Sequence, residues 1–172
     1  PLHWHEFYEI ELFLSGKGTS LMNGSEYPIE RGRLFFVTPV DIHSYKLTQT
    51  SETINISFTS KAIEDMGITE KLAVNNGAVL SLSDEETDWI YLMSKKLKTE
   101  SHAEGFMNKK YISQIMSCIM IEILRKIGRR RDASKSPESI QSAIQYIYLH
   151  FREELNLELV ASQAGLSPNH FS

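Results

Sequence analysis

Fold and function are most strongly constrained by the stretch 157-LELVASQAGLSPNHF-171. Its pattern predicts a short helix, a tight turn and the start of a second helix, with small Ala161 letting the two helices cross closely. Gly165 can adopt the positive φ that such a turn requires. Ser167 can cap the second helix, and Pro168 suits its first position. This pattern is typical of a helix-turn-helix that reads the DNA major groove, although an ordinary helical hairpin is the alternative.

Together with an amphipathic helix expected over residues 139–155, this stretch closely resembles the first helix-turn-helix of AraC/XylS transcription regulators. The resemblance implies that the second helix continues, and that a connecting helix and a second helix-turn-helix follow. Because the sequence ends at Ser172, we expect DNA contacts from Ser167, Asn169 and His170 only, and His170 could equally be an exposed residue without a role. We therefore expect these 172 residues alone to bind an operator weakly or not at all.

Charge is distributed unevenly upstream of this motif. The net charge of −4 has the wrong sign for a dedicated nucleic-acid binder, because phosphate neutralisation needs clustered Lys and Arg. A basic cluster nevertheless runs from Arg125 to Arg131, and the polar residues 129–138 are predicted to form a linker. This cluster indicates either a solvated linker or a DNA-facing patch.

Residues 83–128 are predicted to form two helices. Ser83 and Glu86 have the spacing of a capping box, which starts the first helix. The second helix carries apolar residues over more than one face, so it should be buried on two sides. We expect one side to pack on the preceding domain and the other to meet a partner helix in a homodimer. Burial wholly within one subunit is the alternative.

Residues 3 to about 60 have the pattern of short β-strands. Strands are predicted at 6–14, 34–37, 42–47 and 53–58, with a hairpin over 21–27 around Asn23-Gly24 and a turn at Arg31-Gly32. Phe7, Glu9, Glu11 and Phe13 should share one face of the first strand. A short helix over 61–66 is expected within the less clear span 61–82. The regular turns favour a β-sandwich or a small barrel.

The N-terminal residues resemble the first motif of the cupin superfamily, His3-x-His5-x3-Glu9-x6-Gly16. Gly32, Pro39 and His43 resemble its second motif, although Asp41 stands where glycine is common and the final spacing is one residue short. The sensing domains of AraC-type regulators share this barrel. The expected fold is therefore α+β: a cupin-like β-barrel (double-stranded β-helix) over 1–82, a helical dimerisation pair over 83–128, a linker over 129–138, and the beginning of an all-α helix-turn-helix domain over 139–172.

Two functions compete for the polar residues of this barrel. In metal-dependent cupins, His and Glu in these positions bind a divalent metal, and here the set would be His3, His5, Glu9 and His43. The sensing domains of AraC-type regulators usually bind organic effectors instead, so we expect no metal or other cofactor. The residues expected to contact the effector are His3, Trp4, His5, Glu9, Glu11, His43 and Tyr45.

The effector is expected to be rich in hydroxyl or amino groups. Buried carboxylates such as Glu9 and Glu11 require partners, and sugar hydroxyls can donate to them while Trp4 or phenylalanine rings stack on C–H faces. A sugar is therefore the favoured class. Trp4 and Tyr45 could equally be core residues.

We conclude from the sequence that the chain is a ligand-responsive, DNA-binding transcription regulator rather than an enzyme. A metal-dependent cupin enzyme, such as an isomerase or a dioxygenase, is the runner-up, and a pure dimerisation module is the third possibility. The single cysteine, Cys118, excludes an internal disulfide, and no apolar run is long enough to span a bilayer. We therefore expect a cytoplasmic protein with no membrane partner.

Overall fold

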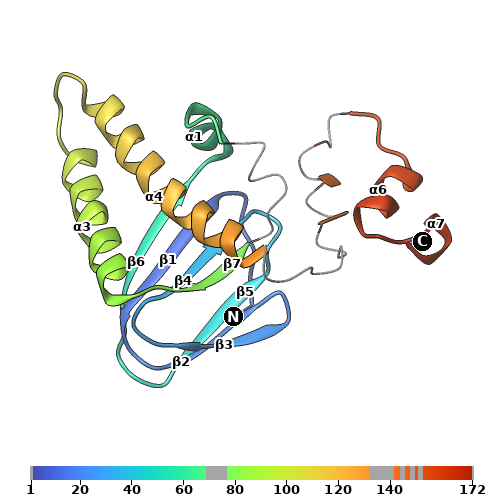
Figure 1. Cartoon of the computed structure of the whole chain (residues 1–172), viewed down its shortest axis with the longest axis horizontal. Coiled ribbons are helices and arrows are strands. Elements are labelled where there is room, and N and C mark those ends of the chain that lie inside the picture. Colours follow the sequence, from blue (N-terminus) through green and yellow to red (C-terminus); the bar gives the residue numbers. More distant parts are fainter. Residues whose placement is uncertain are drawn as a thin grey trace.

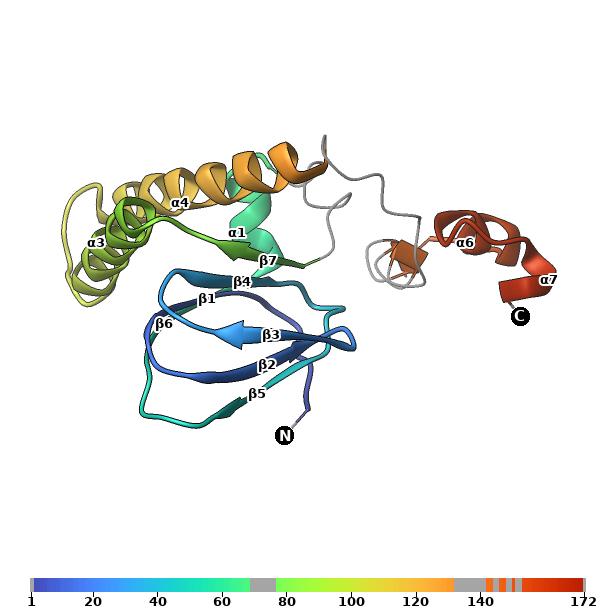
Figure 2. The same ribbon diagram turned by 60° about the horizontal axis from the view of Figure 1, so that its bottom comes forward.

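The computed structural model of the chain describes residues 2–68, 77–131, 142–143, 146–147, 150 and 153–171. Within them, seven strands form two antiparallel sheets that face each other (Figures 1 and 2). The first sheet has the order β6-β1-β4-β7, with strands Glu52–Phe58, Tyr8–Ser15, Arg33–Val37 and Ala78–Ser81. The second has the order β3-β2-β5, with strands Ser25–Ile29, Gly18–Met22 and His43–Leu47.

The side chains of strand β1 alternate between two hydrophobic cores, one on each face of the first sheet. Tyr8, Ile10, Leu12 and Leu14 belong to the cluster that also contains the helices, so they lie on the outer face of the first sheet. Phe13 joins residues of both sheets in a second cluster, which includes Met22 and Phe35. The predicted alternation of β1 is therefore confirmed, and Glu9 and Glu11 lie on the inner face with Phe13.

The predicted strands are present with small shifts of their ends. The hairpin turn is confirmed by positive φ angles of 50° at Asn23 and 80° at Gly24. Strand β1 begins at Tyr8, two residues later than predicted, so His3 and His5 precede it. Strand β7 was not predicted, because four residues are too few to show an alternation within the unclear span 61–82.

Two helices cover the outer face of the first sheet (Figure 2). Helix α3 (Asp84–Ser101) begins with the predicted capping box between Ser83 and Glu86. Helix α4 (Asn108–Arg131) buries Ile119 and Ile123 in the outer-face cluster, while the opposite side of α4 is exposed. The predicted short helix is also present as α1 (Ser60–Asp65). None of the helices in the described ranges is both long and apolar enough to cross a membrane.

The C-terminal stretch folds into two short helices, α6 (Leu157–Gln163) and α7 (Pro168–Phe171). Gly165 between them has a φ of 67°, Ala161 is fully buried, and Phe171 packs against a small cluster around Ala143. The two short helices and the positive φ at Gly165 expected from the sequence are therefore present. Most of the linker predicted at 129–138 and of the helix predicted at 139–155 lies outside the described residues.

Candidate functional site

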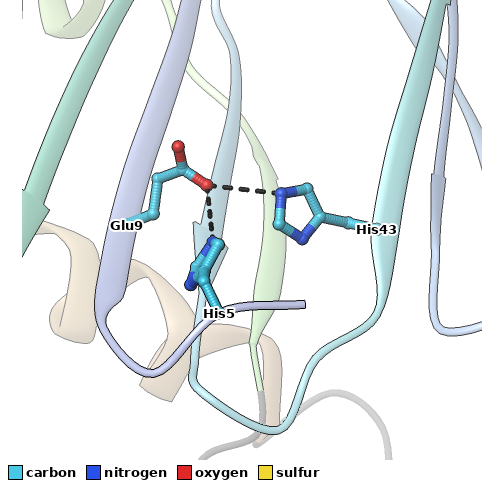
Figure 3. Close-up of side chains that lie close together, drawn as sticks. All are labelled: His5, Glu9 and His43. Atoms are coloured by element: carbon cyan, nitrogen blue, oxygen red, sulfur yellow. Dashed lines mark hydrogen bonds and ion pairs between the residues drawn. The ribbon is translucent and has the colours of Figure 1, made fainter. Parts of the chain in front are cut away.

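Three polar side chains meet between the two sheets (Figure 3). One oxygen of Glu9, Oε2, lies 3.0 Å from Nε2 of His5 and 3.3 Å from Nε2 of His43. Glu9 and His43 are buried, and His5 is half-buried. The cluster is therefore a nearly dehydrated carboxylate held between two imidazole rings.

Three different elements place these groups. Glu9 points inward from β1, where it pairs in register with Val37 of β4. His43 begins β5 in the opposite sheet. The segment before β1 is held to β5 by a two-way backbone bridge between His3 and His43, which brings His5 over the carboxylate. The site thus joins the two sheets at one end of the barrel.

Glu9 is stabilised as an anion. Burial raises the pKa of Glu9, but hydrogen bonds from His43, Asn55 and His5 lower it by more than burial raises it. The pKa is therefore about 2. The amide of Asn55, on β6, donates to the second oxygen, Oε1. Because the folded pKa lies below the ordinary 4.5, Glu9 stabilises the fold above about pH 4.5, and this contribution is lost as the pH falls toward 2.

The pKa of Glu11 shifts in the opposite direction, although Glu11 lies only two residues after Glu9 on β1. Burial, and then the negative charge of Glu9, raise the pKa of Glu11 to about 7, while His43 lowers it slightly. At neutral pH the site therefore combines one fixed anion with one carboxyl group that is near its titration point. Such a pair can both accept and donate hydrogen bonds to a ligand.

We expect Glu11→Gln to remove a pH dependence of stability. With a folded pKa of about 7 and an ordinary value of 4.5, Glu11 favours folding at low pH, and this advantage declines as the pH rises from 4.5 to 7. The decline should be on the order of 2–3 kcal/mol. Urea unfolding of both proteins between pH 4.5 and 8 measures it. If the wild type and Glu11→Gln showed the same slope, Glu11 would not be the titrating group.

Of the two histidines, His43 leaves hydrogen-bonding capacity for a ligand. Nδ1 of His5 lies 2.8 Å from the Phe7 carbonyl oxygen, so this nitrogen donates. Its Nε2 faces an ionised carboxylate, which requires either a second proton on the ring or a cation between the two groups. Among the described residues, Nδ1 of His43 is buried without a hydrogen-bond partner. A buried polar atom of this kind costs about 1–3 kcal/mol unless something binds to it.

A divalent metal fits this donor set. One ligand atom from each of His5, Glu9 and His43 lies within 4.8 Å of the others, and imidazole with carboxylate is a donor set that transition metals accept. His3 is close by, since its ring centroid lies 4.3 Å from that of His43. Three of the four residues predicted for a metal therefore form one group, and the fourth lies beside it.

The other predicted contact residues lie at different depths. The ring of Tyr45, on β5, makes an edge contact with Phe13 at 6.3 Å and borders the interior. Trp4 is largely exposed, so its contact with an effector stays a prediction. Asn55 was missed by the sequence analysis, although its place on the inner face of β6 opposite Glu11 follows from the alternation of that strand.

Comparison with known proteins identifies a family. A family model described as the AraC-like ligand binding domain matches residues 1–147. The HTH-type transcriptional activator RhaS of Escherichia coli O81 (strain ED1a) is 23% identical over 97% of this chain. RhaS of Salmonella paratyphi A is 24% identical over the same share. The chain spans 62% of the length of each of these activators.

Solved structures of two regulators resemble the chain more distantly. The AraC-like transcriptional activator CuxR is 19% identical, with a TM-score of 0.49, over 96% of this chain and 59% of its own. Apo ToxT K231A from Vibrio cholerae is 10% identical, with a TM-score of 0.49, over 98% of this chain and 84% of its own. At these scores the structural likeness carries no argument, so the assignment depends on the sequence match.

Proposed function

The chain belongs to the family of AraC-like ligand binding domains, and on this premise we propose that it is the sensing part of a transcription regulator. In this proposal a small-molecule effector binds inside the barrel at His3, Trp4, His5, Glu9, Glu11, His43 and Tyr45. The relatives that this chain matches are named as transcriptional activators, which supports regulation rather than catalysis.

The observation that carries the proposal is the buried polar cluster. A core that served stability alone would be apolar at this position, since buried charges cost free energy unless they are paired. Here Glu9 and Glu11 lie on the same inner face, and His43 has a nitrogen to which no described residue bonds. An effector that completes these hydrogen bonds would bind between the two sheets.

The chemistry of the cluster favours a ligand with hydroxyl or amino groups. The Glu9 carboxylate only accepts hydrogen bonds, whereas Glu11 can donate in its protonated form. Sugars present both donors and acceptors, and their C–H faces suit the rings of Phe13 and Tyr45. We propose a sugar as the effector class.

A thermal-shift screen tests this assignment. Pentoses, hexoses and aliphatic amines would be added to the protein, and at least one sugar is expected to raise the Tm of the wild type. The same compound should leave the Tm of Glu11→Ala unchanged, whereas it should still stabilise Glu52→Ala, a matched change of an exposed acid on the same sheet. If no compound stabilised the wild type, or if Glu11→Ala responded equally, the site would lie elsewhere.

A metal-dependent function is the second candidate, because His5, Glu9 and His43 bring three possible ligand atoms within 4.8 Å of one another. His5, Glu9 and His43 would hold the metal, which would act as a Lewis acid. Elemental analysis of protein purified without a nickel column distinguishes the two functions. About one zinc, iron or manganese per chain would favour the metal, and a metal-free protein that still binds a sugar would favour the effector.

We further propose that α4 forms a homodimer. Tyr111, Cys118 and Ile121 are exposed along α4, and Ile121 is 46% exposed. Apolar side chains at this spacing suit a partner helix. In this arrangement the two regulator subunits would meet through the helical region.

Cys118 allows the dimer to be tested directly. A short bismaleimide is expected to convert the wild type into a covalent dimer, because Cys118 lies in the middle of the exposed side of α4. Cys118→Ser should give no covalent dimer, and Ile121→Lys should reduce the yield of covalent dimer by about tenfold or more. Equal cross-linking of Ile121→Lys, or a monomer at every concentration in sedimentation, would contradict this interface.

DNA recognition is assigned to the C-terminal helices in this proposal. Asn169 and His170 are exposed on α7, and Ser167 precedes it with its hydroxyl 2.7 Å from Nδ1 of His170. An effector would change the affinity for DNA only if it bound two orientations of these parts with different affinity.

A further inference from the structure

A cavity lies on the opposite face of the first sheet from the polar cluster. It is open to solvent and has a volume of about 800 Å³ between β6, α3 and α4. Its walls are mainly apolar and come from Ile54, Ile56 and Phe58 of β6, Leu97 of α3, and Ile112 and Met116 of α4. Its volume falls within the range of about 300–1,000 Å³ that is typical of small-molecule sites.

This cavity, here called the outer groove, is not lined by His5, Glu9 or His43, although Asn55 borders both the groove and the polar cluster. Ile54 and Ile56 pack against the outer-face cluster, while Asn55 between them donates inward to Glu9. Side chains alternate along β6, so the same strand forms the floor of the groove and one wall of the polar site. A ligand in the groove would therefore not touch His5, Glu9 or His43.

The rim of the groove carries a positive charge. Lys95 and Lys98 of α3 line it, both are exposed, and no ion pair is recorded for either ammonium group among the described residues. Lys96, between them, is not part of the lining and pairs with Glu100 at 3.3 Å. One acidic residue, Glu52, also lines the groove, at the start of β6. The lining thus has two cationic groups against one anionic group.

We propose that the outer groove binds a single-chain amphipathic anion. The alkyl chain would lie on Ile54, Ile56 and Met116, and the negative head group would lie at Lys95 and Lys98. Burial of the chain supplies most of the affinity, since removing apolar surface from water is the main favourable contribution to binding. The lysines select an anion over a neutral or cationic amphiphile of the same length.

Isothermal titration with dodecanoate, kept below its micellar concentration, tests the proposal. The wild type is expected to bind one molecule saturably. Lys95→Gln/Lys98→Gln should weaken binding by about fivefold or more, because two partly solvated ion pairs are lost. Lys96→Gln is the matched control and should bind within about twofold of the wild type. Ile54→Trp, which fills the groove, should abolish binding while circular dichroism confirms that the variant folds.

Other outcomes would overturn the assignment. Equal affinity for dodecyltrimethylammonium would remove the role of the lysines, as would unchanged affinity in Lys95→Gln/Lys98→Gln. A dimer of the wild type that Ile54→Trp dissociates in sedimentation would assign the groove to a second copy of the chain. Loss of dodecanoate binding in Glu9→Gln, with normal binding in Ile54→Trp, would place the anion inside the barrel instead.

Discussion

Asp41→Asn is expected to lower the free energy of unfolding by about 2–4 kcal/mol, the largest stability effect of the substitutions considered. Asp41 is fully buried. Its Oδ2 accepts hydrogen bonds from the backbone N–H and hydroxyl of Thr38, at 2.7 and 2.6 Å, and from the backbone N–H of Gly77 at 3.1 Å. Its Oδ1 accepts from the Asn23 amide at 2.6 Å.

An amide in this position would place two N–H groups among donors. Whichever way the asparagine turned, at least one of the groups now bonded to Asp41 would lose its acceptor in a dry environment. The network joins the β2–β3 turn to the loop before β5 and to the residue before β7, so its loss should loosen this end of the barrel.

Urea unfolding monitored by circular dichroism measures this effect. Asp65→Asn is the control, because Asp65 is exposed on helix α1 and its one ion pair among the described residues is with Lys61. It should change stability little. Asp41→Asn with the stability of the wild type would show that the network contributes no net stabilisation.

Glu9→Gln is expected to abolish the response to the effector while leaving the fold intact. The amide of glutamine can still accept from Asn55, but its NH₂ group would replace the oxygen that faces His5 and His43. A charge-assisted acceptor is lost, so effector affinity should fall by about tenfold or more. The stability at neutral pH should fall by about 1–3 kcal/mol.

The pH profile tests whether Glu9 is the group that titrates as the protein is acidified. The wild type should lose the contribution of Glu9 as the pH falls from about 4.5 toward 2, because the folded pKa of Glu9 is about 2. Glu9→Gln cannot titrate, so its acid limb should be shallower. Parallel acid limbs, together with an unchanged effector affinity, would contradict the role given to Glu9.

Much of the fold could be predicted because local signals were strong. Asn23-Gly24 permits positive φ at both turn residues, and the capping box at Ser83 and Glu86 marks a helix start that tertiary packing did not override. The start of β1 was misplaced by two residues, because alternation continues past the point where β6 and β4 stop offering partners. Pairing partners, rather than local pattern, decide where a strand begins.

The candidate site was predictable in composition but not in arrangement. Spacing along β1 correctly placed Glu9 and Glu11 on one face, and the resemblance brought His43 to them from another strand. The sequence did not reveal that Asn55 would hold the second oxygen of Glu9. It also did not reveal that the two carboxyl groups would have pKa values on opposite sides of the ordinary one, because that depends on burial and on partners from three elements.

The most direct test is a crystal structure of the protein purified without a nickel column and incubated with a total extract of cellular metabolites. Our account predicts density for an organic molecule between the two sheets, within hydrogen-bonding distance of Glu9, Glu11 and Nδ1 of His43. Density for a ligand only outside the barrel, with nothing bound beside these three residues, would contradict it.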